Sequence, residues 1–338
     1  MLVESVPNVS EGRRLDVVER LGDALTSVPG VFLLDRTSDA SHNRSVFTVA
    51  GEHEAVASGL ERLVAGAIDE IDMEVQLGEH PRIGAVDVVP FVPLGDTTLD
   101  DCIELARGFG QRIATRYDLP VYLYAAAATR SDRVKLADVR RGQYEGLKVE
   151  IGHNGRQPDF GPARMHPRAG AVAVGARPFL IAWNINLASD DVELAKRIAR
   201  RVRESGGGLP RLQANGFRVE EPERGFPVRA QVSMNLLDFR VTPLWRAWEV
   251  VKELAAEDGV ELAESELIGL APLAALLDVA DHAEADGGAP SHARPDTSPG
   301  EPGSVDARLA VAAEAVKLRD FSPLMALELR LADARGRA

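Results

Sequence analysis

The sequence predicts an α+β protein with two subdomains, each following the order βαββαβ, with helices packed on the outer face of each sheet. The chain has 338 residues, which is long enough for two domain-sized units. Residues 179–270 show the six elements in that order, and residues 2–93 show the same order before further elements extend it. This order is that of the ferredoxin-like fold, or split βαβ unit.

The second half shows the order most clearly. An apolar, β-branched run at 179–187 predicts a strand, and residues 189–204 carry apolar side chains at helical spacing. Two strand-like runs then flank the turn-rich segment 220–227. A helix beginning near Pro243 and a strand at 261–270 complete the unit.

The first half repeats the pattern with additions. The expected elements are a strand, a helix, two strands, a helix and a strand, at 2–9, 14–27, 30–35, 45–51, 53–71 and 84–93. A helix at 99–117 and a strand at 120–127 extend this unit. No residue-level repeat links the halves, so the duplication is a prediction from the element pattern.

Composition divides the chain further. We expect subdomains at 1–178 and 179–283. Residues 284–304 are rich in Pro, Gly and Ser and nearly lack large apolar side chains, which predicts a flexible linker. Residues 305–338 then form a C-terminal helix and tail that dock on the body.

The totals restrict the class of function. A formal net charge of −13 and an aromatic content of 5% argue against binding nucleic acid or an anionic membrane. An anionic ligand would therefore need a local basic pocket. One cysteine, Cys102, precludes an internal disulfide, and no signal peptide or membrane-length apolar run is present. We expect a cytoplasmic protein.

His80, in the stretch GEHPRIGAVDVVPF, is the strongest candidate for chemistry. Imidazole exchanges protons near neutral pH, Pro81 stiffens the next step of the backbone, and Gly84 permits close approach of a ligand. A histidine that only hydrogen-bonds a loop carbonyl explains the residue equally well. The spacing alone does not separate the two interpretations.

A second polar cluster lies between two predicted strands. Asp39, His42, Asn43 and Arg44 supply an acceptor, a titratable ring, an amide and a fixed cation within six residues. The alternative is an Asx-type turn with a solvated arginine. No H-x-x-x-H pair or repeated Cys/His spacing is present, so we expect no metal.

The third feature is the segment 161–177, which carries three arginines (164, 168 and 177), His166 and no acid. In an acidic chain this local reversal of charge suggests an anion-binding surface, with a solvated basic connection as the alternative. Phosphate-binding glycine motifs and a G-x-S-x-G elbow are absent from the sequence.

Several stretches together resemble one known family, the formiminotransferase domain of glutamate formimidoyltransferase. They are VPNVSEGR, HNRSVFTVAG, GEHPRIGAVDVVPF, FGQRIA with LPVYLY, RRGQYEGL, PDFGP, GARPFLIAWNINL and QVSMNLLDF, in the family's order. The segment RLAVAAEAVKLRDFSP resembles the family's closing segment, and no stretch resembles the cyclodeaminase domain that is fused in some relatives. Where many relatives carry Gly-Glu, this chain has Ala125 and Ala126.

The resemblance implies a fold, an activity and a site. Residues 1–178 and 179–283 would be the N- and C-terminal formiminotransferase subdomains, with folate in a groove between them. The chain would transfer a formimino group from N-formimino-L-glutamate to tetrahydrofolate, in histidine degradation, as a homodimer. The catalytic histidine falls on His80, and the folate-contacting segment falls on Gly161, Pro162, Ala163, Arg164, Met165, His166, Pro167, Arg168, Ala169 and Gly170.

The chemistry of the residues fits this activity. One histidine that switches roles can carry out both proton transfers, and Asp39 or Glu79 can orient it. Arg44 and Arg82, with His42 and Asn43, are candidates for binding the substrates' carboxylates. Tetrahydrofolate is the one-carbon acceptor, and no metal is required. The alternatives are a formyltransferase on the same scaffold and a folate-binding protein without turnover.

Overall fold

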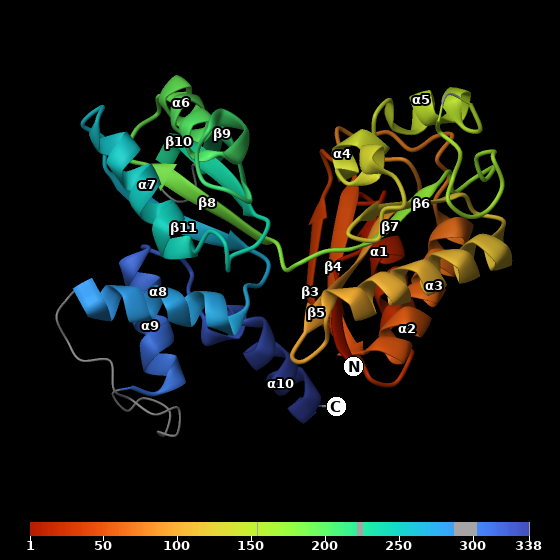
Figure 1. The fold of residues 1–338 in the computed structure, drawn as a ribbon, viewed down its shortest axis with the longest axis horizontal. Helices are drawn as coiled ribbons and strands as arrows, with labels where there is room; N and C mark the ends of the chain where they lie inside the picture. The colour runs from red at the N-terminus through yellow and green to blue at the C-terminus, as the bar shows by residue number, and fades with distance from the viewer. Residues whose placement is uncertain (154, 222–225, 287–302, 338) are drawn as a thin grey trace. The chain divides into compact units, whose positions relative to one another are not determined.

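The computed structural model (Figure 1) describes residues 1–153, 155–221, 226–286 and 303–337. They form two compact units, each with its own hydrophobic core. Unit 1 contains Met1–Pro178 with the chain's end from Ala334, and unit 2 contains Phe179–Asp333. The predicted α+β class with two subdomains is confirmed.

Unit 1 is built on the ferredoxin-like order. Its first strand is interrupted, and both parts of it, β1 (Leu2–Ser5) and β2 (Asn8–Val9), lie between β4 (Arg44–Glu52) and β5 (Val86–Leu94), antiparallel to both. On the far side of β4 lies β3 (Val31–Asp39). The crossover helices are α1 (Leu15–Thr26) and α2 (His53–Glu70).

Two parallel strands extend this sheet beyond β5. The next strand is β7 (Val172–Ala176), and β6 (Val121–Ala125) pairs with β7. The helix α3 (Leu99–Tyr117) leads into β6 and begins with a capping box between Thr98 and Asp101. Between β6 and β7 the chain forms the short helices η1 (Ser131–Arg133), α4 (Leu136–Val139) and α5 (Gln143–Glu150).

Both faces of the extended sheet are covered. Val121 and Leu123 of β6 belong to the core that contains α1, α2 and α3. Tyr122 and Tyr124 alternate with them and form a second core with side chains of α4 and α5, among them Val139 and Leu147. The structure departs here from the prediction, which placed helices on one face of each sheet only.

Unit 2 has the same order in four antiparallel strands. They run in the spatial order β11 (Leu262–Ile268), β8 (Ile181–Leu187), β10 (Phe226–Leu236) and β9 (Leu212–Glu221). Trp183 and Ile185 of β8 are buried in one core with side chains of α6 (Val192–Val202) and α7 (Leu244–Ala256). Asn184 and Asn186 alternate with them and hydrogen-bond acids of β11.

Helices follow the second sheet. The first, α8 (Leu273–Asp286), runs three residues into the segment predicted as a linker, which is a correction to the start of that segment. Residues 287–302 of that prediction lie outside the described residues. After them come α9 (Val305–Ala315), whose Leu309 and Ala312 join the core of unit 2, then η4 (Pro323–Met325) and α10 (Leu327–Arg337). In the described ranges no helix is long and apolar enough to cross a bilayer.

Candidate active site

His80 lies in the loop between α2 and β5, and only 7% of its surface is exposed. Its Nε2 atom lies 3.6 Å from Oδ2 of Asp87, which is too long for a hydrogen bond. Nε2 is buried and has no hydrogen-bond partner among the described residues. Nε2 therefore does not hydrogen-bond a loop carbonyl in the described part of the chain. Burying a polar atom without a partner costs free energy, so the protein pays for this placement of the ring.

Asp87 is the acid beside His80. It is fully buried on β5, where the register shifts because Asn8 pairs with Val88 while Val9 pairs with Val86. Its Oδ1 atom accepts a hydrogen bond of 2.9 Å from the backbone N–H of Ile83, and its Oδ2 atom is paired with the guanidinium of Arg140. Burial acts to raise the pKa of this carboxyl, but Arg140 and His80 outweigh burial and hold the pKa below its usual value.

The pKa of His80 is lowered. Burial is the largest cause, the carboxylate of Asp87 opposes it, and the charges of Arg140 and Arg44 lower the pKa further. A lowered pKa leaves the imidazole neutral at neutral pH, with a lone pair available to accept a proton.

Arg44, on β4, is the second cation near His80. Burial lowers its pKa, and the acid charges that act against this shift are those of Asp39 and Asp87. Its Nε atom is buried without a hydrogen-bond partner, and no ion pair links its guanidinium to another side chain in the described ranges. This guanidinium is therefore available to an anionic ligand.

Neither Asp39 nor Glu79 pairs with His80 among the described residues. Asp39 accepts a hydrogen bond of 2.8 Å from the N–H of His42, and Nδ1 of that ring lies 3.1 Å from the second carboxylate oxygen. The backbone N–H of His42 is the largest cause that lowers the pKa of Asp39. Glu79 is exposed, and its N–H donates to the carbonyl of Ser41 at 3.3 Å. The prediction that one of these acids lies against His80 is corrected to Asp87.

Two residues predicted to bind substrate, Arg82 and Asn43, form their hydrogen bonds with other residues of the protein. Arg82, 4% exposed, donates to both carboxylate oxygens of Glu145, at 3.1 and 2.8 Å, and to the side chain of Gln76 at 2.8 Å. Asn43 accepts from the N–H of Gly12 at 3.0 Å and donates to the carbonyl of Leu77 at 2.9 Å. Both side chains hold loops together.

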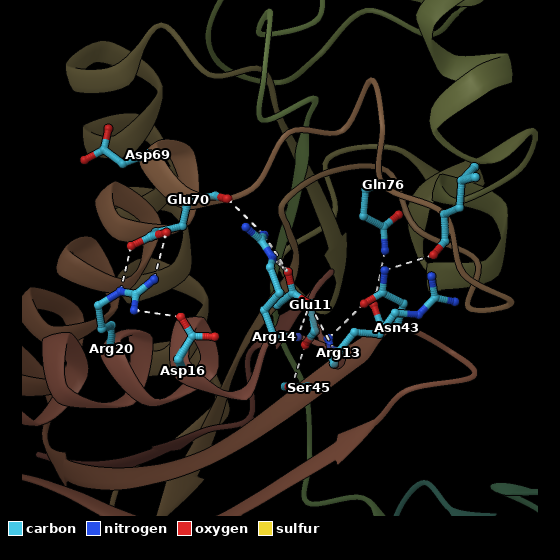
Figure 2. A network of polar contacts seen from close by, with 12 residues as sticks. Glu11, Arg13, Arg14, Asp16, Arg20, Asn43, Ser45, Asp69, Glu70 and Gln76 are labelled. Atoms are coloured by element: carbon cyan, nitrogen blue, oxygen red, sulfur yellow. Dashed lines mark hydrogen bonds and ion pairs between the residues drawn. The ribbon is translucent and has the colours of Figure 1, made fainter.

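The network around Asn43 supports the start of β4, where Arg44 lies (Figure 2). The carboxylate of Glu11, which is buried, accepts from the backbone N–H of Arg13 and of Arg14 at 3.0 and 2.9 Å. The carbonyl of Glu11 accepts a hydrogen bond of 2.6 Å from the hydroxyl of Ser45. A Cβ on Gly12 would collide with the backbone of Asp39 and Arg44, so only glycine lets the two loops approach so closely.

The segment 161–170 lies against the loop of His80. The N–H of Ala85 donates to Ala169 and the N–H of Ala171 donates to Ile83, at 2.9 and 3.0 Å. A Cβ on Gly84 would overlap the carbonyl oxygen of Ala171. We interpreted Gly84 as a point of ligand approach, but the structure uses its small size for this contact between backbones.

Within the segment, a tight turn fixes His166. His166 and Gly170 exchange both backbone hydrogen bonds, at 2.9 and 3.1 Å, and Nδ1 of His166 accepts from the N–H of Ala169 at 3.0 Å. Burial is the main cause that lowers the pKa of this ring. The guanidinium of Arg164 pairs with Asp118, while that of Arg168 donates to the carbonyl of Asp69 at 3.0 Å. Both arginines are exposed.

Metal chemistry has no evident site in the part of the chain that the structure describes, where no group of three or more His, Cys, Asp or Glu side chains could hold an ion. The residues missed by sequence reasoning are Asp87 and Arg140. A signal for Asp87 was present, since it is a lone acid in the apolar strand AVDVVPF, and a buried acid requires a partner. Arg140 begins the stretch RRGQYEGL, but no local pattern in the sequence pairs it with Asp87.

Comparison with known proteins identifies the family. Two family models match, the formiminotransferase domain, N-terminal subdomain, over residues 2–177 and the formiminotransferase domain over residues 182–286. The chain belongs to the formiminotransferase domain family. Similar relatives include the glutamate formimidoyltransferase of Streptococcus pyogenes serotype M1, 44% identical over 83% of this chain and 92% of that protein.

Two further relatives agree. The glutamate formimidoyltransferase of Thermoplasma acidophilum is 45% identical, over 83% of this chain and 91% of that protein. The formimidoyltransferase-cyclodeaminase of Rattus norvegicus is 43% identical, over 82% of this chain but 52% of that protein. The predicted membership of the family is confirmed.

Proposed function

We propose that this member of the family is a glutamate formimidoyltransferase, which transfers the formimino group of N-formimino-L-glutamate to tetrahydrofolate. The products are 5-formiminotetrahydrofolate and L-glutamate. Family membership and relatives of this name along nearly their full length support the activity. We also propose that residues 1–178 and 179–283 are the N- and C-terminal subdomains of the formiminotransferase domain.

One structural observation supports this activity most. The backbone that follows His80 pairs with the end of the segment 161–170 through residues 83–85 and 169–171. The proposed catalyst and the proposed folate-contacting segment are therefore joined within unit 1. Folate bound along that segment would be brought next to a neutral, buried imidazole.

In the proposed mechanism His80 relays one proton in two transfers. The ring nitrogen of tetrahydrofolate attacks the formimino carbon, a new C–N bond forms, and His80 accepts the proton that this nitrogen loses. The resulting imidazolium gives the proton to the glutamate nitrogen as the old C–N bond breaks, so that glutamate leaves as a neutral amine. A positioned acid–base group of this kind contributes about 10²–10⁴-fold to a rate.

Arg44 holds a substrate carboxylate in this proposal. Its guanidinium has no ion pair with the described residues, in contrast to that of Arg82, which is bound to Glu145. A charge-assisted pair also fixes orientation, because a guanidinium binds a carboxylate through two parallel hydrogen bonds. The contacts of Asp39 and Glu79 do not support a role for either acid next to His80.

Steady-state assays of the purified chain with tetrahydrofolate test the proposal. Formiminoglutamate and formylglutamate are offered as separate donors. We expect turnover with formiminoglutamate and a lower kcat/KM with formylglutamate. A preference for the formyl donor would overturn the assignment of the donor, and folate binding without turnover would indicate the non-catalytic alternative. Homodimer formation and cytoplasmic location stay predictions.

A further inference from the structure

The carboxylate of Asp87 is held in place by two groups other than His80. Its Oδ1 atom is engaged by the N–H of Ile83 at 2.9 Å, three residues after His80 in the same loop. Its Oδ2 atom is engaged by Arg140, the residue that caps the C-terminus of α4. This second oxygen also faces Nε2 of His80, which has no hydrogen-bond partner among the described residues. The carboxylate is therefore held on both sides and presents its charge to one ring nitrogen.

We propose that Asp87, held by Arg140, is a positioning residue that fixes the tautomer and the orientation of His80. The inference rests on the proposed function, in which His80 relays the proton of the transfer. A carboxylate facing Nε2 favours the tautomer that carries its hydrogen on Nε2. The lone pair is then on Nδ1, and His80 exchanges the substrate's proton at that nitrogen.

The distance of 3.6 Å fits a group that acts in one state of the cycle. When Nδ1 accepts a proton, the ring becomes a cation, and attraction to Asp87 shortens the contact of Nε2 to hydrogen-bond length, about 2.8 Å. The pair thereby stabilises the imidazolium that the reaction forms for a short time. Catalytic hydrogen bonds are often longer in the free protein than in the reacting complex.

Arg140 limits how far Asp87 raises the pKa of His80. It shares the oxygen that faces His80, so it keeps Asp87 ionised and also offsets part of that negative charge. Without Arg140, the buried carboxylate would bind the proton of His80 more tightly and the ring would release it to the leaving amine less readily. The charged groups that act on His80 are Asp87 from β5, Arg140 after α4 and Arg44 from β4.

Tyr124 of β6 completes the surroundings of the pair. Its hydroxyl is close enough for Arg140 and Asp87 to act on it, and burial raises the pKa of its phenol. The phenol is therefore uncharged over the pH range in which His80 titrates.

Two variants with opposite expected effects test the proposal. Asp87→Asn keeps the shape but removes the charge and places an N–H₂ group where an acceptor stood. We expect kcat to fall by about 100-fold, within the range for acid–base catalysis, with KM unchanged, and the acid limb of kcat/KM to move to lower pH. In Arg140→Gln the acid limb moves to higher pH, because a cation near His80 has been removed.

Asp159→Asn is the matched control. Asp159 is also buried in an ion pair with an arginine, Arg133, at 2.5 Å, and it also accepts from a backbone N–H, that of Leu123, at 2.8 Å. It does not contribute to the pKa shift of His80. We expect this variant to be less stable while keeping the acid limb where it is in the wild type.

A measurement on the unaltered chain guards against variants that fail to fold. Nitrogen-15 NMR of the imidazole of His80 distinguishes the two neutral tautomers, and we expect the hydrogen on Nε2. The inference is overturned if the hydrogen is on Nδ1, or if neither folded variant moves the acid limb while His80→Ala is inactive. Full activity of His80→Ala would instead overturn the proposed role of His80 itself.

Discussion

Burial weakens His80 as a base, and a buried carboxylate restores part of that strength. Burial removes water that would stabilise the imidazolium, and Arg44 and Arg140 add repulsion. Asp87 opposes both effects from one side of the ring. The outcome is an imidazole that is neutral at neutral pH and still able to accept a proton for a short time.

The pH dependence of the reaction follows from the direction of this shift. Free enzyme with a protonated His80 cannot act as the base, so kcat/KM falls as the pH falls through the pKa of His80. Because that pKa is lowered from its usual value of 6.5, we expect the midpoint of the acid limb below pH 6.5. A pH profile of kcat/KM for formiminoglutamate checks this prediction. A midpoint above pH 6.5 would contradict the account of the site.

Replacement of Arg44 by alanine tests the anchor for the substrate. A hydrogen bond to a charged group is worth about 1.5–3 kcal/mol, so we expect the KM for formiminoglutamate to rise about 10- to 100-fold. The control is Arg20→Ala, since Arg20 is an exposed arginine of the same unit that pairs with Asp16 and Glu70 (Figure 2). A donor KM that is equal in both variants would show that Arg44 does not bind the donor.

At the scale of residues, the sequence predicts candidate side chains of the site better than it predicts the residues that pair with them. His80 and Arg44 are candidates in the sequence because connecting segments often carry functional side chains. Arg82 and Asn43 are candidates of the same kind in the sequence. In the structure, however, Arg82 pairs with Glu145 and Asn43 accepts a hydrogen bond from Gly12, and both partners are distant in sequence. Only the folded chain brings Arg140 to Asp87, because pairing over 53 residues leaves no local pattern.

At the scale of elements, the end of β6 carries a strained residue. Ala125 has a φ of 54°, in the left-handed region that costs a side chain about 1–2 kcal/mol. Many relatives carry glycine at this position, as stated above for the Gly-Glu pair that Ala125 and Ala126 replace. We expect Ala125→Gly to stabilise the protein by about 0.5–1 kcal/mol, because relief of strain exceeds the added entropy of the unfolded chain.

Chemical denaturation of two neighbouring variants checks this prediction. Ala126 is exposed and its φ is not positive, so Ala126→Gly relieves no strain and we expect it to destabilise by about 0.4–1 kcal/mol. The two substitutions make the same chemical change with opposite expected signs. Equal effects would show that the backbone at Ala125 is not strained.

Gly84 tests the contact between the two loops of the site. A methyl group there would overlap the carbonyl of Ala171, so Gly84→Ala must separate residues 83–85 from 169–171. We expect weaker binding of folate and lower stability, measured by titration calorimetry and thermal unfolding. The control is Gly146→Ala in α5, where the added Cβ would meet open space. Unchanged folate binding in Gly84→Ala would contradict the link between the loops.

The elements that repeat the βαββαβ order could be predicted from periodicity, and α3 matches its expected range of 99–117. The helices α4 and α5 were not predicted. They have four and eight residues, too short for a helical period to stand out, and packing against β6 and β7 rather than propensity holds them.

At the scale of the whole molecule, an acidic chain must bind anionic substrates. Net charge is −13, so long-range attraction does not bring carboxylates to the protein, and binding depends on local cations. Arg44 is such a cation, and the segment 161–177 contains no acid. Composition predicts this need for a local basic site. The structure is needed to distinguish an arginine that is paired within the protein, such as Arg82, from one that is available to a ligand, such as Arg44.

The proposed function depends above all on His80 as the group that relays the proton of formimino transfer. The most direct test compares turnover and folate binding in the unaltered 338-residue chain, in His80→Ala and in the control His53→Ala, whose histidine lies at the start of α2. The account predicts that His80→Ala binds tetrahydrofolate as the wild type does and loses about 10²–10⁴-fold in kcat, while His53→Ala keeps both properties. Wild-type kcat in folded His80→Ala would contradict it.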